Sequence, residues 1–420
     1  MMQSVQMLHT FITEMEGAYF GYIEATAKCL LPHLEPSNDD ISALCEEVRG
    51  TALQCWGLLI KSARKSAEEQ GQPSSPLAAE LLRKGLQATF QVLEQNQQDC
   101  EMLTSTACGI TECVKCSGPG VLTGDEVKTL VERVFVLIDS SFSRTAEYQK
   151  TKAGAKAAEA NLPKELGDEE DEDEPDPDAE EEQLRRNYEE ILGAVMEVAA
   201  AEFMPCLPAC AEKIRQWVAS DDNKVLGLYL ACDAIQHLKE HSVQIWPVFM
   251  DEAFRVLRVG KDRDHDAMTA SAYAINLAAP LASFAQAAPE AFRGLASIVG
   301  GAKPKKKDDT KLKMVHDNAV AALLTLAVEK AAACPPEVQA WRLIVDKLPL
   351  REDEDEAVKV HEKVVDLVLA QHQGLLDQRT GPVLAVLAEI YRGSRADSVR
   401  PASGQSKRRT EQDPAEPGVH

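Results

Sequence analysis

Apolar residues recur along this chain at spacings of three and four, and the stretches that contain them recur about every forty residues. Such spacing places the apolar side chains on one face of a helix. No stretch alternates with a period of two over a convincing length. The pattern therefore predicts an all-α protein. Examples of the apolar stripes are Val127, Leu130, Val131, Val134, Phe135 and Ile138, and later Val320, Leu323, Leu324, Ala327 and Val328.

The helices are expected to form pairs whose first members begin near positions 3, 41, 97, 182, 222, 264, 312 and 353. Most of the intervals lie near the roughly 40 to 47 residues of a HEAT or armadillo unit. One pair cannot bury its apolar faces alone, so neighbouring pairs must stack. The sequence predicts a right-handed α-solenoid of about eight HEAT-type helix pairs, with an insertion in the interval that follows position 97.

Three short motifs predict where individual helices begin. Residues Thr123 to Glu126 form a capping box, in which the threonine and the glutamate satisfy each other's free backbone N–H groups. The pair Ser75 and Pro76 places a capping hydroxyl before a proline suited to the first helical position. Residues Pro335 to Glu337 predict a similar helix start.

The most unusual segment is an acidic run at residues 164–183, which contains thirteen carboxylates and one lysine. It carries −12 of the formal net charge of −23. Like charges at this density repel one another, and Pro175 and Pro177 oppose helix formation further. The segment is predicted to be a disordered insertion. The preceding helix is expected to extend into a basic approach that contains Arg144, Lys150, Lys152 and Lys156.

Two interpretations of the insertion remain open. It can be a solubilising loop, or it can attract cationic partners at short range through a field that salt screens beyond roughly 8 Å. In the second interpretation, seven consecutive carboxylates form a cargo-binding site for Lys- and Arg-rich partners. These residues are Asp168, Glu169, Glu170, Asp171, Glu172, Asp173 and Glu174.

The overall charge excludes a protein that binds nucleic acid through a basic surface, because 68 acidic residues outweigh 45 lysines and arginines. No apolar run reaches the roughly 18 residues of a membrane span. Glu14 and Glu16 interrupt the stretch where a signal peptide needs apolar residues. We therefore expect an intracellular protein that binds neither nucleic acid nor membranes.

No motif in the sequence indicates catalysis or a bound metal. Cys113 and Cys116 have a metal-like spacing, but Cys206 and Cys210 are too far away and wrongly spaced to complete a zinc site. The eleven cysteines are expected to be reduced and mostly packed as small apolar residues. The prediction is a protein without enzyme activity, cofactor or metal. An enzyme that uses Cys113 and Cys116 is the least favoured alternative.

Four tryptophans lie far apart, one in each of four predicted pairs: Trp56, Trp217, Trp246 and Trp341. Packing between helices is favoured over an exposed stacking surface. The domain organisation that follows from the pattern is a HEAT block at residues 1–163, the insertion at 164–183, a second HEAT block at 184–393, and a disordered tail at 394–420.

The order of several local stretches resembles the C-terminal half of importin-β-superfamily nuclear transport receptors, most of all the importin beta-three type, also called Ran-binding protein five. The resemblance covers residues 3 to about 393, with an acidic insertion at a similar place. The stretches that carry it are Gln6 to Leu8, Phe20 to Glu24, Leu31 to Leu34, Glu47 to Arg49, Leu58 to Arg64, Gly227 to His237, Ala272 to Tyr273 and, most specifically, Asp317 to Ala357.

The resemblance implies a receptor, or the C-terminal fragment of one, that shuttles between cytoplasm and nucleus and binds basic cargo in a flexible superhelix. It also implies phenylalanine-glycine nucleoporins and Ran-GTP as partners, with Ran-GTP held mainly by amino-terminal repeats. Leu226 stands where relatives tend to carry an aromatic residue, and the tail from Ser394 has no counterpart. The alternative function is a HEAT-repeat interaction scaffold that takes no part in transport.

Overall fold

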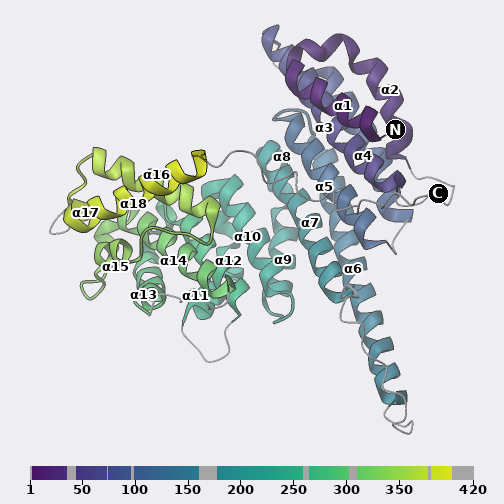
Figure 1. Cartoon of the computed structure of the whole chain (residues 1–420). Coiled ribbons are helices and arrows are strands. Elements are labelled where there is room, and N and C mark those ends of the chain that lie inside the picture. Colours follow the sequence, from purple (N-terminus) through teal and green to yellow (C-terminus); the bar gives the residue numbers. More distant parts are fainter. Residues whose placement is uncertain are drawn as a thin grey trace, which may run out of the picture. The chain divides into compact units, whose positions relative to one another are not determined.

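The computed structural model describes residues 2–35, 44–72, 74–95, 99–159, 177–258, 264–301, 310–376 and 380–399. Regular structure in these ranges is helical throughout, with no strand, as the sequence predicts. The chain divides into two compact units, Met1–Arg255 and Val256–His420, and the boundary falls within helix α11. Figure 1 shows the helices of each unit following one another in pairs.

The first unit contains five helix pairs among its described residues. In order, its elements are α1 (Met2–Met15), η1 (Glu16–Tyr22) and α2 (Ile23–Leu34); α3 (Leu44–Glu69) and α4 (Pro76–Gln95); α5 (Cys100–Ser117) and α6 (Gly124–Glu159); α7 (Pro177–Val198), α8 (Ala200–Phe203), η2 (Met204–Cys206) and α9 (Leu207–Val218); and α10 (Lys224–Leu238), η3 (Lys239–Val248) and α11 (Met250–Leu257).

The second unit contains three more pairs in its described part. Its elements are α12 (His265–Ala278), η4 (Ala282–Gln286) and α13 (Ala288–Val299); α14 (Thr310–Glu329), η5 (Ala331–Ala333) and α15 (Ala340–Lys347); and α16 (Glu354–Leu369), α17 (Gln373–Leu376) and α18 (Thr380–Val399).

The first helix of each pair packs against the first helix of the next pair. In the first unit the row runs α1, α3, α5, α7 and α10, and in the second it runs α12, α14 and α16. The helices in the middle of a row are covered on two sides, so their apolar residues extend around most of the helix. On α14, for example, every residue from Asn318 to Leu324 is buried. Stacking of this kind buries apolar surface pair by pair instead of around one centre.

The observed helix starts lie close to the predicted ones, at Met2, Leu44, Cys100, Pro177, Lys224, His265, Thr310 and Glu354. Two of the three motifs are confirmed. The backbone N–H of Thr123 donates to Glu126 Oε2 over 2.9 Å, and the N–H of Ala78 donates to Ser75 Oγ over 3.2 Å.

The predicted helix start at Pro335 is wrong. Residues 334–339 form a turn closed by the Val338 N–H on the Pro335 carbonyl at 2.9 Å, and α15 begins only at Ala340. The thiol of Cys334 donates to the Val338 carbonyl at 3.5 Å and so holds the turn against the chain that follows it. The prolines therefore start a turn here because their missing N–H groups suit a turn as well as a helix.

Helix α7 begins at Pro177, earlier than the expected position near 182 and inside the stretch predicted as the insertion. Pro177 has the fixed φ and the missing N–H that suit a first helical turn. Asp178 and Glu180 in that turn complement the positive end of the helix dipole. The same carboxylates that oppose helix in a long run therefore favour one at this particular place.

Three of the four tryptophans are buried between helices: Trp56, Trp217 and Trp246. Trp56 Nε1 donates to the Leu81 carbonyl of α4 at 3.0 Å. Gly85 lies one turn further along α4, and a Cβ built there would stand 2.5 Å from the same nitrogen. Trp341 is only partly buried, so it is the one of the four that differs from the predicted core role.

We expect Gly85→Ala to lower the free energy of unfolding by about 1–3 kcal/mol, because overpacking displaces Trp56 from its hydrogen bond. Gly50→Ala on α3 is the matched control, since a Cβ there meets nothing within 4 Å. That change should stabilise by about 0.5–1 kcal/mol through helix propensity. Urea unfolding followed by tryptophan fluorescence measures both. Equal stabilisation by the two substitutions would contradict the close approach.

Candidate functional site

The predicted cargo-binding residues, Asp168 to Glu174, lie outside the residues that the structure describes, so their role stays a prediction. The helices on either side of them are described. Helix α6 ends at Glu159 and α7 begins at Pro177. The exposed residues of α6 beyond Tyr148 carry the expected basic approach, and Figure 1 shows this part of α6 extending beyond the helices it packs on.

A buried polar cluster fastens these two helices together. Glu181 on α7 accepts hydrogen bonds from Arg144 at 2.5 and 2.9 Å and from Ser141 Oγ at 2.5 Å, both on α6. Arg185 donates to Ser141 Oγ at 3.1 Å and to Thr145 Oγ1 at 3.0 Å. A buried bidentate pair with its remaining groups satisfied resists separation more than a surface ion pair does. Arg144 is therefore committed to Glu181 and does not belong to the free basic approach.

A negatively charged surface is built by α5, α7 and α10, three consecutive members of the first row. Glu112 on α5 and Glu190 and Glu197 on α7 are exposed, and Asp233 on α10 is partly exposed. Lys115 of α5 contributes one positive charge on the same side, since it acts on Asp233 electrostatically. We call these four carboxylates, together with Glu189, the acidic face.

Two carboxyls of the acidic face are unusual because they face each other. Glu189 on α7 is only 4% exposed, and Asp233 of α10 lies within hydrogen-bonding reach of it. Burial, followed by the charge of Asp233, raises the pKa of Glu189 well above its ordinary value. Burial likewise raises the pKa of Asp233, to about 6. Two adjacent carboxyl groups with little access to water retain one proton between them, because two neighbouring negative charges would repel each other.

Two apolar hollows lie on the pairs themselves. In the first unit, a hollow of about 320 Å³ lies between α4 and α6, lined by Leu86, Phe90, Leu122 and Leu130. At its edge, Arg83 pairs with Glu126 at 2.5 Å, and the Arg133 guanidinium lies 4.1 Å from the centre of the Phe90 ring. These polar groups border a floor that remains apolar.

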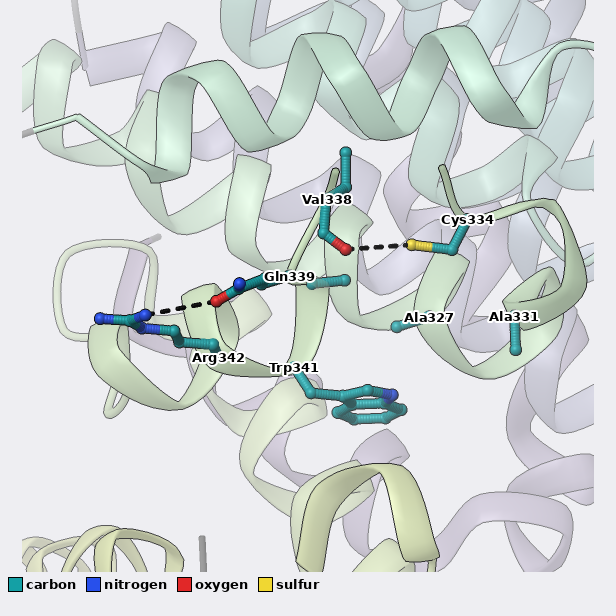
Figure 2. A pocket seen from close by; sticks show the side chains of 8 residues that line it. Ala327, Ala331, Cys334, Val338, Gln339, Trp341 and Arg342 are labelled. Carbon is teal, nitrogen blue, oxygen red and sulfur yellow. Dashed lines mark hydrogen bonds between the residues drawn. The ribbon is translucent and has the colours of Figure 1, made fainter. Parts of the chain in front are cut away.

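The second hollow, of about 290 Å³, lies in the second unit, where α14 ends and the turn at 334–339 leads into α15. Figure 2 shows the Trp341 indole facing this hollow, with Val338 and Cys334 on the opposite side and Ala327 and Ala331 beside it. The ring of His372 lies against Trp341, with centroids 4.9 Å apart and the two ring planes tilted by 47°. The turn that the sequence wrongly predicted as a helix start therefore forms one wall of an aromatic hollow.

Half of the ten described cysteines are buried in the helix contacts, and Cys29 and Cys108 are exposed. In the described part of the chain, Cys55, Cys113, Cys206, Cys210 and Cys232 are buried and no disulfide is present. Burial raises the pKa of Cys113 well above its ordinary value, and it raises that of Cys116 as well. A thiol held in its neutral form is a poor nucleophile. Among the described residues, no three His, Cys, Asp or Glu side chains are placed to hold a metal ion.

No single helix among the described residues is long and apolar enough to cross a membrane; one bent pair, Pro177–Val198 with Ala200–Val218, would meet the criteria of length and composition.

Comparison with known proteins gives the fold. No family model matches the sequence. The structure of Kap121p bound to RanGTP superimposes with a TM-score of 0.65 at 15% identity, covering 96% of this chain and 36% of that one. Kap121p bound to Nup53p matches with a TM-score of 0.63 at 14% identity, and Kap121p bound to Pho4p with 0.62 at 15%, each with the same coverage of 96% and 36%. The chain has the α-solenoid fold of the karyopherin Kap121p.

This match confirms the predicted α-solenoid of stacked helix pairs. The chain spans about a third of the length of the Kap121p chains that it matches, with 36% of them covered. The acidic face and the two hollows were not predicted from the sequence. Their residues come from separate helices, and no local motif connects them.

The pKa values of Glu189 and Asp233 are raised in the folded protein, so between pH 4 and pH 7 the folded state binds more protons at this pair than the unfolded chain does. The contribution of the pair to the free energy of unfolding therefore falls as pH rises. Asp233→Asn removes the part of this loss that comes from the ionisation of Asp233. We expect it to raise the free energy of unfolding above that of wild type at about pH 7.5, by on the order of 3 kcal/mol from the shift to about 6, and to give no gain near pH 4.

Differential scanning calorimetry across this range measures the effect. The exposed Asp222→Asn is the matched control and should follow wild type at every pH. If the stabilities of wild type and Asp233→Asn changed in parallel with pH, the result would contradict a raised pKa at Asp233.

Proposed function

We propose that this chain is an importin-β-type nuclear transport receptor, or the C-terminal part of one, that binds basic cargo in a flexible superhelix for import through the nuclear pore under Ran-GTP control. The observation that carries the proposal is the match of the helix order to Kap121p over 96% of the chain, since Kap121p is known in complexes with Pho4p, Nup53p and RanGTP. The local stretches that resemble the importin beta-three type support the same function.

The proposed mechanism follows from how the pairs stack. Each pair contacts only its neighbours, so small shifts at each joint add up to a change in curvature along the array. A cargo that fits one curvature and a Ran-GTP that fits another then exclude each other, provided that each binds its own state more tightly. In this scheme the present residues supply part of the elastic array and a cargo-facing acidic surface.

In this proposal, negatively charged residues attract the cargo. The segment Asp168–Glu174 would act as a short-range electrostatic attractant for lysine- and arginine-rich cargo. The acidic face on α5, α7 and α10 adds fixed carboxylates to this field. The fastening of α6 to α7 through Arg144 and Glu181 keeps the segment's two flanking helices together.

Passage through the pore is assigned to the two apolar hollows. Each has an apolar floor and a polar rim, which suits the insertion of one phenylalanine ring with a flexible polar chain on either side. Phenylalanine-glycine repeats of nucleoporins have this composition. Several weak sites along one array give useful affinity through multivalency while each contact still exchanges quickly.

Retention on immobilised phenylalanine-glycine repeats tests this proposal. We expect the chain to be retained, and Leu86→Lys in the α4–α6 hollow to reduce retention several-fold, because the ammonium would have to be buried on an apolar floor. Gln91→Lys is the matched control, with the same added charge at an exposed position on the same helix. Repeats with serine in place of phenylalanine should retain nothing. Absence of retention of the wild-type chain would favour the scaffold function instead.

Neutralising Asp168 to Glu174, with Asn for Asp and Gln for Glu, should weaken the binding of a basic import-signal peptide about tenfold at low salt and much less at high salt. Glu181 is left unchanged, because its loss would release α6 from α7. A control variant exchanges Asp and Glu within the same seven positions, which keeps the charge. Fluorescence anisotropy gives the dissociation constants. An unchanged constant in low salt would reject the role of the segment as an attractant.

A further inference from the structure

The carboxyl pair Glu189 and Asp233 is built into the contact between α7 and α10. Asp233 lies against Gly193 of α7, where a Cβ would stand only 2.0 Å from its Oδ2 atom. Gly193 thus leaves the space that the carboxylate occupies. Glu189 precedes Gly193 by one helical turn, so it lies on the same side of α7. The two acids are brought together by the stacking of consecutive pairs.

Glu189 lacks a counter-charge. Its Oε1 atom is buried without a hydrogen-bond partner, although a buried carboxylate normally receives several donors. The nearest groups that act on it are Asp233 and Glu190, both acidic. An unsatisfied buried oxygen beside a partly exposed carboxylate leaves hydrogen-bonding capacity unused at the contact between α7 and α10.

The surroundings favour a positive ligand. Glu190 and Glu197 of α7 raise the pKa of Asp233, while only Lys115 of α5 lowers it by its charge. Within the described residues, Lys115 forms no ion pair with any of these carboxylates, since none of the observed ion pairs includes it. No metal-binding group of three side chains occurs in the same part of the structure. The pair therefore suits an organic cation that brings its own N–H donors.

We propose that Glu189 and Asp233 form a receptor site for a single lysine or arginine side chain of a basic partner protein, which enters between α7 and α10. This rests on the proposed function and names a specific cargo contact for it. The incoming ammonium or guanidinium group donates to both carboxyls and replaces the proton that they share in the free protein. Glu190 and Glu197 steer the cation towards the site from its edge.

Binding at this site is coupled to pH. The groups that act electrostatically on the pair are Glu190 and Glu197 on α7, Lys115 on α5 and Cys232 on α10. His237, one turn beyond Asp233 on α10, interacts with Glu197 and Lys115 instead. A cation favours the ionised pair, so its binding releases the proton that the pair shares, and affinity falls as pH decreases through the range in which the pair takes up that proton. Ordinary surface carboxylates stay ionised in this range and contribute no such dependence.

The experiment uses the full chain and a short fluorescein-labelled peptide of lysines separated by glycines. Wild type should bind it with the release of about one proton near neutral pH, measured by titration calorimetry in buffers of different ionisation enthalpy. The double variant Glu189→Gln with Asp233→Asn should lose about tenfold in affinity together with the proton release. The same peptide with norleucine in place of lysine should not bind.

Glu24→Gln with Asp222→Asn is the matched control, since it removes the same charge at two exposed positions and should behave as wild type. Equal peptide affinity and equal proton release in wild type and the Glu189/Asp233 variant would overturn the inference and make the pair a structural feature only. That result would leave the proposed function standing as long as the chain is still retained on phenylalanine-glycine repeats. Loss of that retention in wild type would instead count against the proposed function.

Discussion

Every feature of this protein depends on the fact that a single helix pair cannot bury its own apolar surface. Helix α14 shows this most clearly, because it is buried between α12 on one side and α16 on the other. Its seven consecutive residues from Asn318 to Leu324 are all shielded from water. A helix apolar on nearly all sides is stable only inside a row. Each pair therefore needs neighbours, and the chain grows as an array without a single centre.

Close stacking brings polar groups into the contacts, and two contacts handle them differently. Between α14 and α16 the carboxylate and amide groups are satisfied. Asp317 Oδ2 accepts the backbone N–H groups of Arg351, Glu352 and Asp353 at 2.8–3.2 Å, and Asn318 donates to Asp353 at 2.8 Å. These bonds join α14 to the start of α16. In the first unit, α7 and α10 instead bring Glu189 against Asp233 with no cation between them, and that imbalance leaves the first row with a capacity to bind one.

Much of the fold could be predicted because its signals are local. A capping box such as Thr123–Glu126 acts within one helical turn, and an apolar stripe on α6 or α14 reflects the face of that helix alone. Errors arose where one local signal serves two structures. Pro335 suits both the first turn of a helix and a tight turn. The structure contains the tight turn, in which the Cys334 thiol donates to the Val338 carbonyl. Pro177 showed the reverse, since a proline expected to break a helix begins α7.

The number and order of helix pairs, the caps before α4 and α6 and the concentration of charge at 164–183 could be predicted, because each depends on residues that are neighbours along the chain. Which side chains from different pairs meet depends on how the helices stack. Glu189, Gly193 and Asp233 lie in different repeats, and nothing in their local sequence distinguishes them from other helical residues. Their pKa values depend on burial and on distance in space, and helix stacking fixes both.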